Sequence, residues 1–198
     1  MGVDVFFVIS GYLITSIIRD EIRRDRFSLA SFYVRRIRRI LPALTLVSLV
    51  SVAAAWCWML PHELKSFSES LVGVATFTSN FYFVSAGDYF ADPAELQPLL
   101  HSWSLAVEEQ FYIIYPLLLL LLHRLFARHV FVLLFCGCAL SFALTLYLGS
   151  VWPAGNFFLL PSRAWELGLG ALCAFGFVGG VRERWGRWGG AAQEVLAA

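Results

Sequence analysis

The sequence predicts an all-α polytopic integral membrane protein with about five transmembrane helices and one re-entrant or short membrane segment. Hydrophobic residues make up 59% of the 198 residues and charged residues only 15%, with a mean hydropathy of +0.71. A soluble domain has about one quarter charged residues and less than half apolar residues. The apolar residues also gather in blocks of about 20, the length of a helix that crosses a bilayer.

Five apolar blocks are the candidate transmembrane helices. The first is short for a full crossing, and the other four have the length that a bilayer requires. The blocks cover residues 3–18, 40–60, 103–122, 130–150 and 157–177. The net charge of +1 gives no reason to expect nucleic acid as a partner.

Basic residues predict how these helices are oriented. Of the 15 Lys and Arg residues, 13 fall in the patches 19–39, 123–129 and 182–187. Cytoplasmic loops collect positive charge, so all three patches are expected inside the cell. This orientation requires that residues 71–100 do not complete a crossing. We therefore expect a re-entrant or laterally packed segment there, against protein or a wet cavity.

Ionisable residues also occur where lipid should exclude them. Such groups are costly in a membrane and usually face the bundle interior, paired or near water. They are Asp4, His101, Glu108, Glu109, Arg163 and Glu166. Arg163 and Glu166 are three residues apart on one helix, so they share a face and are expected to pair. That pair has two interpretations, a structural ion pair and a part of the site.

The stretch HSWSLAVEEQFY, residues 101–112, holds the other unusual group. Adjacent helical residues project about 100° apart, so Glu108 and Glu109 are not expected to face the same cavity. His101 lies about two turns earlier on nearly the same face. His101 could be a general base or simply a solvated loop histidine, and Asp4 could be no more than a helix N-cap.

A cluster of eight arginines occupies residues 19–39. Four of them form two doublets at the start of a predicted helix: Arg35, Arg36, Arg38 and Arg39. A guanidinium binds phosphate in a bidentate manner, so a phosphate-rich donor on the cytoplasmic side is one candidate ligand. Anionic lipid is the other. The sequence contains no nucleotide-binding glycine motif and no metal-ligand motif, whereas Gly168, Gly170, Gly176 and Gly180 are typical of close helix packing.

Four segments together resemble a known family. GVDVFFVISGYLIT (2–15), FYVRRIRRILPA (32–43), PLLHSWSLAVEEQFY (98–112) and SRAWELGLGALCA (162–174) are similar, in this order, to the signatures of the membrane acyltransferase-3 family. Its members are bacterial inner-membrane proteins that O-acylate sugars, including lipopolysaccharide and other cell-surface polysaccharides.

The resemblance implies a function and site residues. It implies a multi-pass acyltransferase of the bacterial cell membrane that moves an acyl group, typically acetyl, from cytoplasmic acyl-CoA to a hydroxyl of an extracytoplasmic glycan. Acyl-CoA would be a co-substrate, with no bound cofactor or metal. Arg35, Arg36, Arg38 and Arg39 would hold the phosphates of coenzyme A. Arg163 and Glu166 would bind substrate along the path between donor and acceptor, and Glu108, Glu109 and His101 are the catalytic candidates.

One departure from the family shapes the expected domain organisation. The family has an earlier helix, directly before GVDVFFVISG, that carries an arginine and an essential histidine, and it has further C-terminal helices. Residues 1–198 are therefore expected to form a single partial acyltransferase domain that transfers no acyl group by itself. Two alternatives stay open, a transporter or flippase for polar lipids or sugars, and an inactive remnant.

Overall fold

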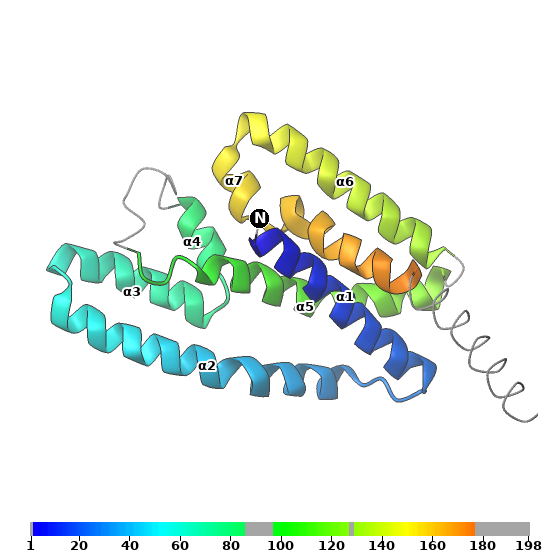
Figure 1. Ribbon diagram of the computed structural model, residues 1–198, viewed down its shortest axis with the longest axis horizontal. Helices are drawn as coiled ribbons and strands as arrows, with labels where there is room; N and C mark the ends of the chain where they lie inside the picture. The colour runs from blue at the N-terminus through cyan, green and yellow to red at the C-terminus, as the bar shows by residue number, and fades with distance from the viewer. Residues whose placement is uncertain (1, 86–96, 127–128, 177–198) are drawn as a thin grey trace, which may run out of the picture.

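The computed structural model describes residues 2–85, 97–126 and 129–176, and every regular element in these residues is a helix (Figure 1). The helices are α1 (Gly2–Arg23), α2 (Leu29–Trp58), α3 (Pro61–Ala75), α4 (Ser79–Ser85), α5 (Ser102–Phe126), α6 (Val130–Val151), α7 (Pro153–Phe158) and an unlabelled helix over residues 160–176. The predicted all-α class is confirmed.

Four of these helices are long and apolar enough to cross a membrane, by length and composition: α1, α2, α5 and α6. α1, α5 and α6 contain the predicted spans 3–18, 103–122 and 130–150. α2 covers the predicted span 40–60 only to residue 58, and it begins earlier, at Leu29. α1 is longer than its apolar block, because its 22 residues continue through the basic segment to Arg23. At 1.5 Å per residue it is about 33 Å long, which is enough to cross the hydrocarbon core.

The last predicted span, 157–177, is interrupted near its start. Phe157 and Phe158 end α7, and Leu159 is extended, with φ −91° and ψ 141°. The final helix therefore begins at residue 160, and residue 177 lies outside the described residues. The Ser162 hydroxyl donates hydrogen bonds to the carbonyl oxygens of Asn156 and Leu159, at 2.8 and 2.9 Å. These bonds satisfy backbone carbonyls that the break in the helix would leave without partners.

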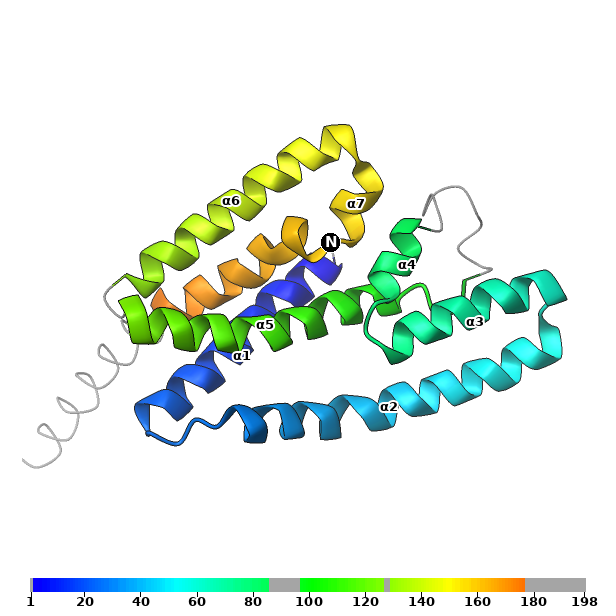
Figure 2. The same ribbon diagram turned by 180° about the vertical axis from the view of Figure 1, so that it is seen from behind.

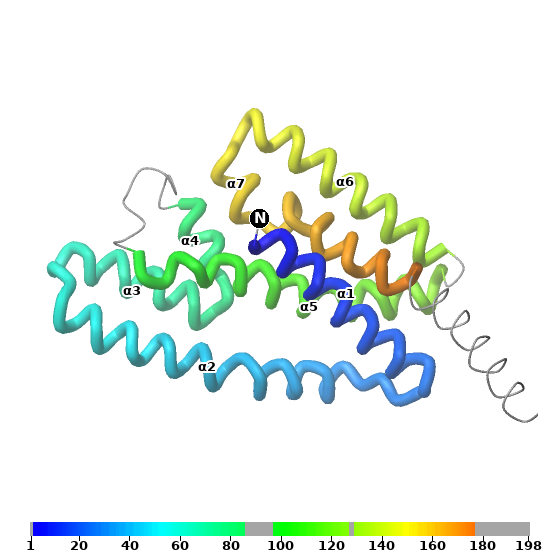
Figure 3. The backbone as a smooth tube through the Cα atoms, viewed as in Figure 1, coloured from blue at the N-terminus to red at the C-terminus, as the bar shows by residue number. Residues whose placement is uncertain are grey.

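The segment predicted to stay on one side of the membrane is made of short helices. α3 has 15 residues and α4 has 7, and the turn between them places Phe77 at φ 54°. α3 folds back along α2, and α4 packs against α5 and α7 (Figure 3). As expected for a re-entrant or laterally packed segment, residues 71–85 and 97–100 contain no helix long enough to cross a membrane, while residues 86–96 lie outside the described residues.

Asn80 shows why a polar residue interrupts this apolar segment. Asn80 is fully buried, and its side-chain amide pairs with that of Gln110 on α5. It also donates to the carbonyl oxygen of Phe158 at 3.2 Å, while Gln110 donates to the carbonyl oxygen of Phe77 at 2.8 Å. The amide pair thus ties α4 and the preceding turn to α5 and α7.

Glycines bring α1 and the 160–176 helix into close contact (Figures 1 and 2). A Cβ atom on Gly11 would collide with the carbonyl of Leu167, and one on Gly170 would collide with the carbonyl of Val8. Gly168 faces the sulfur of Cys138 on α6. Close packing is therefore confirmed at Gly168 and Gly170.

The other two glycines of that prediction differ. A Cβ atom on Gly176 would meet no atom of the described residues within 4 Å, so the packing prediction is wrong there. Gly180 lies outside the described residues.

Candidate active site

A cavity of about 350 Å³ lies between α1, α2 and α5. Half of its lining is apolar, from side chains such as Phe6, Leu13 and Ile40. The other half is polar or charged: Ser10 from α1, Arg36 and Arg39 from α2, and Glu108, Glu109 and Tyr112 from α5. A small-molecule site usually combines apolar walls with convergent polar groups, and this cavity has both, with a larger polar share than most.

Glu108 is held by two hydroxyl groups. It is buried, with 6% of its surface exposed, and it accepts hydrogen bonds from the hydroxyls of Ser10 and Tyr112. Those two hydroxyls also contact each other, so the three groups form a closed triangle between α1 and α5. An ionised carboxylate only accepts hydrogen bonds, so two donors match it.

Neither Ser10 nor Tyr112 was predicted as a site residue. The sequence did contain a signal for Tyr112, because it is four residues after Glu108 and therefore lies on the same face of the helix. Ser10 is one of several small polar residues in its apolar block, and no spacing distinguishes it. Only the packing of α1 on α5 selects it.

Glu109 has a different environment. It is 8% exposed, and its Oε1 atom has no hydrogen-bond partner within the described part of the chain. The expectation that only one of Glu108 and Glu109 would face the cavity is wrong, because both line it. Their directions do differ by about 100°. However, α1 and α2 flank α5 on neighbouring sides, and the cavity extends across the angle between the two carboxylates.

The arginine cluster divides into two faces of α2. Arg36 and Arg39 line the cavity, and the Arg36 guanidinium lies over the Tyr112 ring, 4.2 Å from its centroid. Arg35 instead pairs with Glu21 at the end of α1, at 2.6 Å. Arg38 is exposed and takes part in no ion pair among the described residues. Of the four predicted arginines, the structure brings two together with the glutamates.

The charges in the cavity are not paired with one another. In residues 2–85, 97–126 and 129–176, no ion pair joins Arg36 or Arg39 to Glu108 or Glu109. Two cations and two carboxylates therefore face a shared space without direct contact. This arrangement leaves room for a polar ligand between them.

A second cavity of about 650 Å³ lies at the N-terminal ends of α1 and α5. Its lining includes Asp4, His101, Trp103, Phe157 and Arg163. His101 is exposed at the turn before α5. Along α5, the six residues from the start of the helix to Glu108 cover about 9 Å, so His101 and the two glutamates line different cavities. The structure does not bring His101 together with them.

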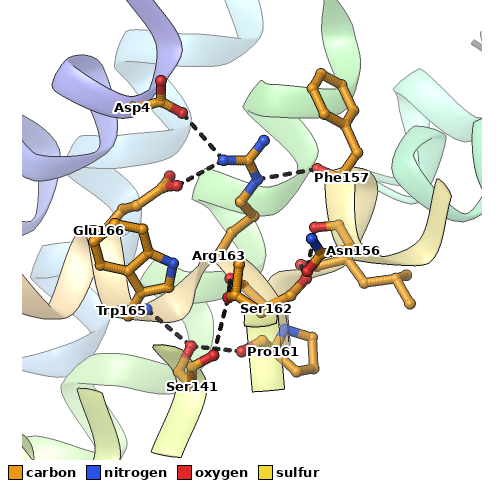
Figure 4. Close-up of polar contacts among 11 residues, drawn as sticks. Asp4, Ser141, Asn156, Phe157, Pro161, Ser162, Arg163, Trp165 and Glu166 are labelled. Atoms are coloured by element: carbon orange, nitrogen blue, oxygen red, sulfur yellow. Dashed lines mark hydrogen bonds and ion pairs between the residues drawn. The ribbon is translucent and has the colours of Figure 1, made fainter. Parts of the chain in front are cut away.

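Arg163 is the centre of the polar contacts in this second cavity (Figure 4). One of its nitrogens contacts both Asp4, at 3.1 Å, and Glu166, at 2.6 Å. Its Nε donates to the carbonyl oxygen of Phe157 at 3.1 Å. The predicted pairing of Arg163 with Glu166 is confirmed. Asp4 lies within α1 and pairs with Arg163 from its first turn, a partner that the N-cap interpretation did not include.

Aromatic side chains lie between the levels of the two cavities. Phe7 follows Asp4 and precedes Ser10 along α1, and its ring is fully buried. It packs edge-on against Trp103 of α5, with ring centroids 6.2 Å apart.

Among the described residues, no group of three or more His, Cys, Asp or Glu could hold a metal ion.

Most of the residues that line these two cavities come from the segments 2–15, 32–43, 98–112 and 162–174. A family model described as "Acyltransferase domain" matches residues 1–192. The chain belongs to this acyltransferase domain family. The matched residues include α1 to α7 and the 160–176 helix, so both cavities lie within the acyltransferase domain.

Two relatives illustrate the similarity. An uncharacterized protein of Haemophilus influenzae is 42% identical over 156 residues, which are 78% of this chain and 62% of that protein. The O-acetyltransferase OatA of Staphylococcus aureus is 34% identical over 180 residues, which are 88% of this chain and 30% of OatA. The acyltransferase domain described here therefore spans less than two thirds of either relative. No solved structure matches the chain.

Proposed function

We propose that this chain is the membrane part of an enzyme that transfers an acyl group, most simply acetyl, from acyl-CoA to a hydroxyl of a cell-surface glycan. The donor would enter from the cytoplasmic side of a bacterial inner membrane, and the acceptor would lie on the other side. Membership of the acyltransferase domain family and the similarity to OatA support the reaction class. The observation that carries the proposal is the cavity in which Arg36, Arg39, Glu108 and Glu109 meet without ion pairs.

The chemistry needs a proton acceptor. The acceptor hydroxyl attacks the thioester carbonyl, a C–O bond forms and the C–S bond breaks. The hydroxyl proton passes to a base, and coenzyme A leaves as the thiol after taking up a proton. Glu109 suits the role of base because its buried Oε1 has no partner in the described structure. Glu108 suits a positioning role because both of its hydroxyl partners hold it in place.

The arginines suit the anionic donor. Coenzyme A carries phosphates, and a guanidinium donates to phosphate oxygens through a planar fork. Arg36 is held against the Tyr112 ring, which orients its guanidinium beside the two carboxylates. The cavity volume of about 350 Å³ is at the lower end for ligand sites, so it fits part of the donor, such as the acyl-bearing arm.

The larger cavity suits the acceptor. Sugars bind well between aromatic faces and charged hydrogen-bonding groups, and this cavity offers Trp103, Phe157, Arg163 and Asp4. The ion pair of Arg163 with Glu166 would fix the guanidinium for such a ligand. His101 at its rim would contact the acceptor and not the thioester.

The assignment of acyl-CoA as the donor is tested by comparing variants on the cavity face of α2 with variants on its other face. The full-length protein is reconstituted in proteoliposomes, and acyl transfer is followed with radiolabelled acetyl-CoA. Arg36→Ala with Arg39→Ala should raise the KM for acetyl-CoA by at least about tenfold, since each lost phosphate contact costs on the order of 1–3 kcal/mol. The matched pair Arg35→Ala with Arg38→Ala removes the same charge from the other face and should leave KM within about twofold. Equal effects of the two pairs would show that the arginines act only as surface charge.

The role of the carboxylate is tested in the same assay. Glu109→Gln should lower kcat by about 100-fold or more, as expected for loss of a general base, with little change in KM. Glu69→Gln, an exposed glutamate on α3, is the matched control. Undiminished transfer by Glu109→Gln would refute its role. Glycan crossing the membrane without acylation would favour a transporter instead.

A further inference from the structure

A third cavity, of about 240 Å³, lies at the basic end of the bundle, where α1 and α5 end and α6 begins. Its lining contains three basic side chains, Arg19, Arg23 and His123, and no carboxylate. The remaining lining residues are apolar: Ile22, Leu119, Val130 and Phe175. The proposed acyl transfer uses none of these residues.

Arg19 is fixed in this cavity by the 160–176 helix. Its guanidinium donates to the carbonyl oxygen of Ala174 at 2.5 Å and lies over the Phe175 ring, 4.3 Å from the centroid. These contacts use one of the five N–H donors of the guanidinium and one of its faces. They orient the group toward the cavity without neutralising its charge.

The other two basic groups are not neutralised either. The side chains of Arg23 and His123 make no hydrogen bond or ion pair with any described residue. Arg19 and Arg23 are one turn apart on the same face of α1, about 6 Å along the axis, and like charges at this spacing repel. The neighbouring acid Glu21 is engaged by Arg35, and Asp20 does not line the cavity. Three basic groups thus converge on a space whose described lining contains no negative charge.

We propose that this cavity binds the phosphate headgroup of an anionic phospholipid. The three basic side chains would surround the phosphate, and the apolar wall would contact the glycerol and the first part of the acyl chains. The site lies at the ends of membrane-crossing helices, the depth at which headgroup phosphates are found. An Arg–phosphate contact at this point would also link α1, α5 and the 160–176 helix, and it is independent of the acyl transfer proposed above.

The site is tested with native mass spectrometry of the full-length protein in detergent, titrated with phosphatidylglycerol or with phosphatidylcholine of the same acyl chains. We expect one phosphatidylglycerol to bind at least about tenfold more tightly than phosphatidylcholine. Arg23→Gln with His123→Gln should remove that preference, while Arg23→Lys alone should retain part of it. Arg19 is left unchanged because it also holds the last helix.

The matched control is Arg24→Gln with Arg124→Gln, because these exposed neighbours lie at the same helix ends but outside the cavity. The control pair should keep the preference for phosphatidylglycerol. Equal loss in both pairs, or no preference in the unchanged protein, would overturn the proposal. A third arm adds inorganic phosphate or coenzyme A as competitors. Displacement of the lipid by either of them at comparable concentration would show a site for soluble phosphates and would also overturn it.

Discussion

The strongest test of the packing in the second cavity is removal of the Arg163 guanidinium. Arg163→Met keeps a long apolar side chain but leaves Glu166, whose side chain is 3% exposed, without its cation. Breaking a buried pair in this way costs about 3–5 kcal/mol. The contact with Asp4 adds less than about 1 kcal/mol, because that carboxylate is 42% exposed. We therefore expect a loss of about 3–5 kcal/mol in the free energy of unfolding.

The reverse substitution should cost less. In Glu166→Gln, Arg163 still contacts Asp4 and the Phe157 carbonyl, so the expected loss is about 1.5 kcal/mol. The double variant Arg163→Met with Glu166→Gln has a neutral amide at position 166, so no buried carboxylate is left without a cation. It should therefore be more stable than Arg163→Met alone, by about 2 kcal/mol.

The assay is unfolding by SDS in mixed micelles, with helix content as the readout. Arg35→Met is the control, because Arg35 and Glu21 are also 2.6 Å apart but are 52% and 28% exposed. An exposed pair contributes less than about 1 kcal/mol, so Arg35→Met should change little. If the costs of Arg163→Met and Glu166→Gln simply add in the double variant, the burial argument is refuted.

Three further predictions concern topology and packing. Single cysteines in residues 19–39 or 123–129, in a background without the native cysteines, should resist labelling from outside intact cells, and strong labelling at 123–129 would contradict the orientation. Gly170→Leu should destabilise the protein by at least about 1–3 kcal/mol in SDS unfolding, because its side chain meets the backbone of α1. Gly176→Leu, with open space around it, should have little effect and is the control. Asn80→Leu should cost about 1–3 kcal/mol by removing the amide that donates to the Gln110 side-chain oxygen and accepts from its nitrogen, and replacing both residues by Leu should recover part of that loss.

Much of the helical fold could be predicted because membrane helices have a strong and simple signal. Length and hydropathy located α5, α6 and the second half of α2, whose first turns are rich in arginine and carry no apolar block. The distribution of arginines predicts that residues 71–100 do not cross. The start of the last helix was missed because Leu159 is apolar and nothing in its side chain marks an extended residue. That break depends on hydrogen bonds from Ser162 that form only in the folded chain.

The site was predicted less completely, for geometric reasons. Arg36 and Arg39 are three residues apart, as are Arg35 and Arg38, so helical spacing already divides the cluster into two faces. Which of the two faces lines the cavity depends on the position of α2 relative to α5, and residue spacing gives no information about that position. The side chains of Glu108 and Glu109 were correctly expected to point in different directions. Both nevertheless line one cavity, because α1 and α2 lie on neighbouring sides of α5 and the cavity extends between them.

The close contact of α1 with the 160–176 helix has a consequence for how the protein is made. α1 is synthesised well before its partners Glu108, Arg163 and Gly170, and Asp4 and Arg163 are separated by 159 positions. At about 5–20 residues per second, α1 waits roughly 8–30 s before its last partner emerges from the ribosome. During that time Asp4 and the backbone beside Gly11 have no native neighbours from the second half of the chain. Until the 160–176 helix is translated, these groups of α1 therefore lack the contacts that they make in the folded protein.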